Sequence, residues 1–102
     1  MIREVEERAT SIESLCRRFR VRRLELFGSA ASGSFNPESS DLDFLVEFED
    51  LPPGEYAEAY FGLLEELQGM FRRNIDLVVA HSLRNPYLIE SIQRSRALLY
   101  AA

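Results

Sequence analysis

Residues 41–48 read Asp-Leu-Asp-Phe-Leu-Val-Glu-Phe, an alternation of side chains that is typical of a β-strand. Asp41 and Asp43 would lie on one face of this strand, roughly 6–7 Å apart along the chain. Two carboxylates placed in this way repel each other and raise each other's pKa, so a shared cation would stabilise them. The stretch therefore predicts a strand with a cation site at its start. The opposite face would be wholly apolar and formed by Leu42, Phe44, Val46 and Phe48.

A glycine-serine turn precedes this strand in the sequence. Residues 21–27 predict a strand that ends at Gly28, and Ser29 can cap the single helical turn that follows. Glycine lets a phosphate approach the backbone closely, and the amides that open the turn would donate hydrogen bonds to it. We therefore expect Gly28 and Ser29 to bind phosphate. Ser40, at the end of the loop over residues 34–40, is a further candidate phosphate ligand.

A third acid interrupts the apolar strand that we predict over residues 74–80. Asp76 has apolar neighbours on both sides, so we expect its side chain to be buried, where an unpaired carboxylate is unfavourable. If this strand neighbours the strand over residues 41–48, then Asp41, Asp43 and Asp76 converge on one cation site. Hard oxygen ligands without nearby sulfur or imidazole favour Mg²⁺ or Mn²⁺. The alternative is a structural Asp76 that is paired with an arginine such as Arg23.

Helices and one more strand complete the pattern. Apolar residues recur at helical spacing over residues 2–19, and a second helix opens after the break at residues 50–54 and ends near Gly69. Asn85 can cap a last helix, and residues 97–100 predict a short edge strand. The element order predicts an α/β (α+β) fold of one domain over residues 1–102, with helices packed against a small mixed sheet. It does not determine the order of the strands. The inward side chains of the second and last helices would be Tyr60, Leu63, Leu64, Leu67, Leu88, Ile89 and Ile92.

Composition excludes several classes of protein. The chain has 102 residues, 46% hydrophobic and 28% charged, which is ordinary for a globular protein. No apolar run approaches the roughly 20 residues that cross a bilayer, and the charged N-terminus lacks a signal-peptide core, so we expect a cytoplasmic protein without a membrane partner. A lone Cys16 and a lone His81 exclude an internal disulfide and a Cys/His zinc site. Without any lysine, the chain has no P-loop.

Charge is unevenly distributed along the chain. The formal net charge of −5 argues against strong direct binding of nucleic acid. Arginines nevertheless cluster over residues 17–23. This cluster predicts either a solvated helix end, where cations complement the helix dipole, or a patch for an acidic partner or for nucleotide phosphates.

Gly28-Ser29, the Asp41-Leu42-Asp43 motif and Asp76 together resemble the pattern of the nucleotidyltransferase superfamily. In that superfamily Gly-Ser is followed by Asp-x-Asp and by a third acid on a later strand. The short length and the ending over residues 84–92 are similar to its minimal nucleotidyltransferase (MNT) branch. The resemblance implies a nucleotidyltransferase fold, metal-bound catalytic residues at Asp41, Asp43 and Asp76, and ATP as substrate. It also implies that this protein is an antitoxin whose partner is a small helical HEPN toxin. Some antitoxins of this branch transfer AMP from ATP to a tyrosine of the toxin. Many relatives carry Ala-Arg-Gly after the Gly-Ser pair, whereas this chain has Ser32 in place of that arginine.

Three functions fit these motifs. The first is two-metal nucleotidyl transfer, in which the acids hold both ions and pyrophosphate leaves from the α-phosphate. The second is an antitoxin that neutralises its toxin by contact alone, to which the altered Ser32 position points. The third is a nucleotide sensor that binds ATP without forming a product.

Overall fold

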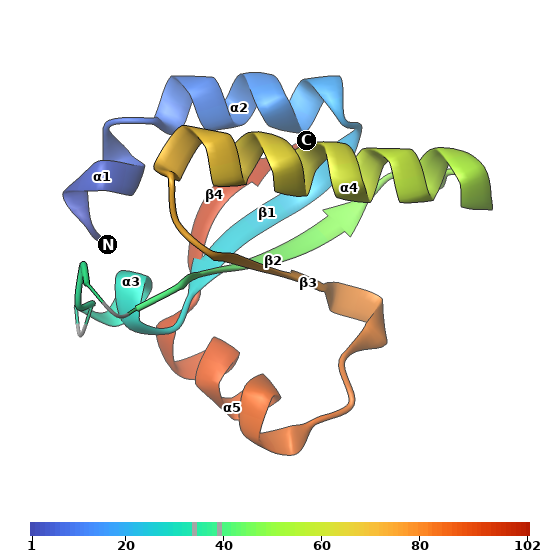
Figure 1. Ribbon diagram of the computed structural model, residues 1–102. Helices are drawn as coiled ribbons and strands as arrows, with labels where there is room; N and C mark the ends of the chain where they lie inside the picture. The colour runs from blue at the N-terminus through green and yellow to red at the C-terminus, as the bar shows by residue number, and fades with distance from the viewer. Residues whose placement is uncertain (34, 39) are drawn as a thin grey trace.

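The computed structural model describes residues 1–33, 35–38 and 40–102, so Ser34 and Ser39 of the expected loop lie outside it. One four-stranded sheet with the order β3-β2-β1-β4 forms its centre. Strand β2 pairs antiparallel with β1 and parallel with β3, and β4 pairs antiparallel with β1, which makes the sheet mixed (Figure 1). The strands are β1 (Val21–Phe27), β2 (Leu42–Phe48), β3 (Ile75–Val79) and β4 (Ala97–Ala101).

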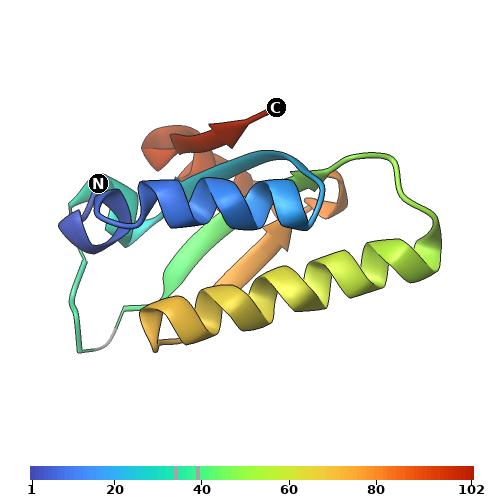
Figure 2. The same cartoon turned by 90° about the horizontal axis from the view of Figure 1, so that it is seen from above.

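Helices cover both faces of this sheet. Helices α2 and α4 lie side by side on one face, as Figures 1 and 2 both show, and α5 lies on the other face. The predicted fold class is therefore confirmed. Among the described residues, no helix is both long and apolar enough to cross a membrane. The helices are α1 (Arg3–Glu6), α2 (Ala9–Arg18), α3 (Ser29–Ser32), α4 (Pro53–Phe71), the 3₁₀ helix η1 (Ala80–Ser82) and α5 (Pro86–Ser95).

Two expected helix boundaries are wrong. The predicted helix over residues 2–19 is interrupted between α1 and α2. The amide of Ile2 donates a 3.0 Å hydrogen bond to the carbonyl of Ala30, so α1 is held beside α3 rather than in line with α2. Helix α4 continues two residues past Gly69 to Phe71 and ends where Arg72 adopts a left-handed conformation with φ of 51°. A tertiary contact thus holds α1 out of line with α2, and a left-handed residue ends α4.

The hydrophobic core is divided between the two faces of the sheet. The larger part lies under α2 and α4 and includes the apolar face of β2, as its alternation predicts. Cys16 is fully buried there, and burial raises the pKa of its thiol to about 12, so it is a core residue. The smaller part is formed by Phe27, Leu45 and Ile92 under α5. Of the predicted inward side chains, Leu63, Leu67 and Ile92 are buried, and Tyr60, Leu64, Leu88 and Ile89 are partly buried.

A buried ion-pair network joins β1 to the segment between α5 and β4. The side chain of Glu25, only 3% exposed, accepts hydrogen bonds of 2.7 Å from both Nε and Nη2 of Arg96 and one of 2.8 Å from Nε of Arg23. The hydrogen bonds from Arg96 are the main reason that the pKa of Glu25 falls from 4.5 to about 2, with Arg23 adding to the effect and burial opposing it. The folded state therefore strongly favours the ionised form of Glu25.

We expect Glu25→Gln to reduce the free energy of unfolding by about 3 kcal/mol at neutral pH, because it removes the charge that both arginines bind. A carboxyl with a lowered folded-state pKa stabilises above its unfolded pKa and loses this effect as pH falls towards about 2. Urea unfolding at pH 7 and pH 3 should therefore show a smaller difference between variant and wild type at pH 3. Glu47→Gln is a matched control, since its pair with Arg22 is half-exposed and should contribute at most about 1 kcal/mol. An equal loss at both pH values would contradict the expectation.

Candidate active site

The sheet brings two of the predicted acids side by side on neighbouring strands. Asp43 of β2 and Asp76 of β3 are direct partners in the parallel ladder, so their side chains project from the same face. Asp41 lies just before β2, close enough to Asp43 for its charge to raise the pKa of that carboxyl. Asp43 is partly buried, whereas Asp41 and Asp76 are exposed. The expectation of a buried Asp76 is wrong, because β3 is an outer strand of the sheet.

The acidic group is electrostatically uncompensated. Burial, followed by the charges of Asp76 and Asp41, raises the pKa of Asp43 from 3.8 to about 6. None of the three aspartates forms an ion pair with another residue in the part of the chain that the structure describes. The alternative of Asp76 paired with Arg23 is therefore wrong, since Arg23 binds Glu25. A cation at this position would relieve the repulsion.

The donor set fits a hard divalent cation that shares its ligands with a substrate. Over residues 1–33, 35–38 and 40–102, no three His, Cys, Asp or Glu side chains are placed so that they could hold one metal ion by themselves, and this includes Asp41, Asp43 and Asp76. Mg²⁺, however, is commonly bound by only one or two carboxylates, with waters and substrate phosphates filling the other positions. The facing pair of Asp43 and Asp76, with Asp41 beside Asp43, suits that mode of binding.

Gly28 lies directly against Asp43. Its φ of 72° and ψ of −151° belong to a region that only glycine adopts readily. A Cβ added at this position would collide with Oδ2 of Asp43 and would lie 3.3 Å from its Cγ. The glycine was expected to make room for a phosphate, and in the structure it makes room for the Asp43 carboxylate. Its amide donates a 2.8 Å hydrogen bond to the hydroxyl of Ser95, so that donor is already engaged.

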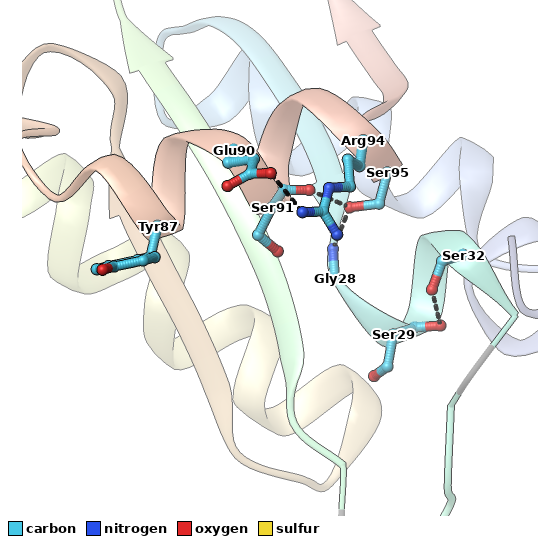
Figure 3. Close-up of a pocket in the computed structure, with 8 residues that line it drawn as sticks. All are labelled: Gly28, Ser29, Ser32, Tyr87, Glu90, Ser91, Arg94 and Ser95. Carbon is cyan, nitrogen blue, oxygen red and sulfur yellow. Dashed lines mark hydrogen bonds and ion pairs between the residues drawn. The ribbon is translucent and has the colours of Figure 1, made fainter.

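A cleft of about 460 Å³ opens beside this glycine. Figure 3 shows α3, with Ser29 and Ser32, on one side of the cleft and α5 on the other. Arg94 lies on the α5 side and forms an ion pair with Glu90 one helical turn away. The cleft is therefore lined by serine hydroxyl groups, one arginine, one glutamate and one tyrosine. The residues that α5 contributes are Tyr87, Glu90, Ser91, Arg94 and Ser95.

Two other predicted phosphate-binding features lie elsewhere. The hydroxyl of Ser40 accepts a 3.0 Å hydrogen bond from the amide of Asn36, and Ser40 lines a different cleft, together with Asp41 and Arg72. The arginine cluster over residues 17–23 lies at the far end of β1. In the β1–β2 ladder Arg23 faces Glu47, four residues or about 13 Å along β2 from Asp43.

The arginine cluster is also largely neutralised within the molecule. Salt bridges join its arginines to nearby carboxylates, with nitrogen–oxygen distances of 4.0 Å or less. The hypothesis that this cluster binds the nucleotide phosphates is therefore wrong. The pairs are Arg18–Glu66, Arg20–Glu49, Arg22–Glu47, Arg22–Asp50 and Arg23–Glu25.

Sequence reasoning missed the polar face of α5. Residues 87, 91, 94 and 95 follow helical spacing and form a stripe next to the apolar Leu88 and Ile92, which pack on the sheet. The spacing of these residues is visible in the sequence, but the apolar stripe alone predicts only how the helix packs on the sheet. His81 lies in η1 and contacts the ring of Tyr56, with 6.0 Å between the ring centroids, outside the cleft beside Gly28.

Several known proteins are similar to this chain in sequence and in fold. The profile of the family described as Nucleotidyltransferase domain matches residues 9–99. MJ1379 of Methanocaldococcus jannaschii, named as a candidate protein adenylyltransferase, is 36% identical over 76 residues, which cover 74% of each protein. Protein adenylyltransferase MntA of Thermococcus cleftensis is 34% identical over 85 residues, which cover 82% of each protein.

Solved structures agree with these matches. A candidate minimal nucleotidyltransferase superposes with a TM-score of 0.72 at 33% identity, over 91% of this chain and 90% of the other. The MNT antitoxin in a complex with a tri-AMPylated HEPN toxin from Shewanella oneidensis has the same fold, with a TM-score of 0.64 at 21% identity over 95% of this chain and 72% of the other. The family profile covers most of the chain, and the aligned relatives are more than 30% identical to it. The chain therefore belongs to the nucleotidyltransferase domain family.

Proposed function

We propose that this protein is a protein adenylyltransferase, which transfers AMP from ATP to a hydroxyl group of a partner protein. The observation that carries the proposal is the facing pair of Asp43 and Asp76 with Gly28 packed against Asp43. The names of the relatives, protein adenylyltransferase among them, support the same reaction. Residues 1–102 would act as one catalytic domain in the cytoplasm.

The nucleotide would occupy the cleft between α3 and α5. Its phosphates would lie near Gly28 and accept a hydrogen bond from the hydroxyl of Ser29, which lines the cleft. Asp41, Asp43 and Asp76 would hold Mg²⁺ or Mn²⁺ against these phosphates. When bound, the metal would neutralise charge on the α-phosphate and on the departing pyrophosphate.

The transfer step needs an acceptor that reaches the outer edge of the sheet. The acceptor hydroxyl oxygen would form a bond to the α-phosphorus while the bond between that phosphorus and the bridging oxygen of pyrophosphate breaks. The hydroxyl proton would leave to solvent beside Asp76, which is exposed on β3 and therefore open to a macromolecular partner. Asp43, partly buried against Gly28, would stay fixed during this approach.

A HEPN-type toxin is the partner that we propose. The supporting observation is the shared fold with an MNT antitoxin that was solved together with an AMPylated HEPN toxin. The protein would then act as the antitoxin that modifies its toxin. The acceptor residue on the toxin would carry a hydroxyl group, as a tyrosine does.

Radiolabel transfer tests the reaction directly. With Mg²⁺ and a HEPN-type toxin, we expect label from [α-³²P]ATP, but not from [γ-³²P]ATP, to appear on the toxin. A double variant, Asp41→Asn with Asp76→Asn, should lose this transfer by more than about a hundredfold, since even residues that only support metal ligands change activity by about 10–100-fold. Asp50→Asn removes an exposed carboxylate outside the site and should leave the transfer unchanged. Equal labelling by the double variant and the wild type would overturn the proposal.

An antitoxin that acts by contact alone is the second candidate. The observation that favours it is the turn over residues 28–33, which carries no basic side chain for a phosphate. A toxicity-rescue assay with Asp43→Ala separates the two candidates. Rescue that persists without AMP transfer supports neutralisation by contact, whereas loss of rescue supports the enzymatic antitoxin.

A further inference from the structure

We propose that Arg94 binds the triphosphate of the nucleotide and supplies, from α5, the positive charge that the turn over residues 28–33 lacks. This inference rests on the proposed function, because it assumes that the cleft beside Gly28 holds ATP. Arg94 lines that cleft together with Gly28 and Ser29. Arg94 lies on a different element from this turn, far along the chain.

Charge balance favours a cation at this position. A nucleoside triphosphate is strongly anionic, and it would lie beside three aspartates and the exposed Glu90. Two divalent ions would leave this assembly with a net negative charge. A basic side chain at the cleft would therefore strengthen binding of the triphosphate. Without such a side chain, repulsion by the surrounding carboxylates would weaken that binding.

Arg94 is the one basic residue in a position to do this. All twelve basic residues of the chain are arginines within the described ranges, and only Arg94 lines the cleft beside Gly28. The arginines over residues 17–23 lie at the far end of β1, and Arg73 is engaged with Glu4. Arg96 follows α5 directly, but both of its bonds are directed to the buried Glu25.

The present partner of Arg94 would not prevent it from binding phosphate. The ion pair with Glu90 is exposed, with side chains 73% and 57% accessible, and pairs of this kind change an equilibrium by only about twofold. A guanidinium group can instead donate two parallel hydrogen bonds to phosphate oxygens, which are about twice as strong as neutral ones. The triphosphate would therefore displace Glu90 from Arg94.

Calorimetric titration with Mg·AMP-PNP, which is not expected to turn over, tests the inference through binding rather than activity. We expect Arg94→Gln to weaken AMP-PNP binding about 10- to 100-fold and to leave adenosine binding within twofold. The affinity of Arg94→Lys for AMP-PNP should lie between those of Arg94→Gln and wild type, because lysine keeps the charge without the planar donor pair. Glu90→Gln should bind AMP-PNP more tightly than wild type. Arg17→Gln removes the same charge from an exposed position outside the cleft and serves as the control, with affinity within about twofold of wild type.

The outcomes separate the inference from the function on which it rests. AMP-PNP binding by Arg94→Gln within twofold of wild type would overturn the role of Arg94 and leave the proposed function in place. An equal loss of AMP-PNP and adenosine affinity would also overturn it, because the residue would then not act on the phosphates. Failure of the wild-type protein to bind AMP-PNP would overturn both. Because the Arg94 side chain is exposed, circular dichroism should show the same fold for variant and wild type.

Discussion

Asp43→Asn is expected to abolish AMP transfer and, at the same time, to make the metal-free protein more stable at pH 8. The activity should fall by more than about a hundredfold, because the substitution removes the central carboxylate of the site. Stability should rise because the pKa of Asp43, raised to about 6 mainly by burial and then by Asp76 and Asp41, shows that the folded state disfavours its ionised form. Asparagine has nearly the same shape and no charge.

The pH dependence of this gain follows from the sign of the shift. Below the unfolded pKa of 3.8 the aspartate is protonated in both states and carries no penalty, and above about pH 6 the penalty is complete. Allowing for partial exposure, we expect the variant to gain about 1–2 kcal/mol in free energy of unfolding at pH 8 and almost none at pH 4. Urea unfolding in EDTA at the two pH values measures this. Asp50→Asn, at an exposed site, should show no such difference, and a variant less stable than wild type at pH 8 would contradict the argument.

Gly28→Ala should damage both the fold and the site. The backbone at this position adopts a conformation that costs about 1–3 kcal/mol for other residues, and the new Cβ would force the Asp43 carboxylate to move, with a similar cost from overpacking. We expect the free energy of unfolding to fall by about 2–5 kcal/mol. AMP transfer should fall with it, because Asp43 would lose its position opposite Asp76.

Gly33→Ala separates these two causes. Gly33 also has a positive φ, of 90°, but among the described residues beyond its chain neighbours no atom lies within 4 Å of a Cβ added there, so the substitution introduces mainly backbone strain of about 1–2 kcal/mol. Thermal unfolding and labelling assays on both variants should show a moderate loss of stability with retained transfer for Gly33→Ala. If the two variants lose equal stability and equal transfer, the close approach of Gly28 to Asp43 is not the cause.

Local patterns predicted the elements that carry the acids, and long-range packing decided the rest. The alternation over residues 41–48 predicted β2 and its two faces because side-chain direction in a strand depends only on sequence parity. That β3 lies beside β2, in parallel and with Asp76 opposite Asp43, depends on the path of the chain through α4, which has no local signal. The exposure of Asp76 follows from this strand order.

The role expected of the arginine cluster was wrong for a related reason. Residues 17–23 are close to Gly28 in sequence, but an extended strand separates them in space, and the carboxylates of neighbouring elements neutralise them. Arg94 is far from Gly28 in sequence, and the fold brings it to the same cleft. Proximity along the chain is therefore a poor guide to the charges that surround a bound anion.

The hydroxyl of Ser95 connects the last turn of α5 to the amide of Gly28, across 67 residues of sequence. A phosphate that took this amide as its donor would displace the Ser95 hydroxyl and remove one contact of the last turn of α5, whose first turn presents Tyr87 at 82% exposure. Linkage between two binding sites is reciprocal. A macromolecule that held α5 in its present position would therefore lower the affinity for the phosphate by the same factor as the phosphate lowers the affinity for that macromolecule. The Gly28 amide thus offers a direct connection by which a bound nucleotide would affect the outer surface of α5.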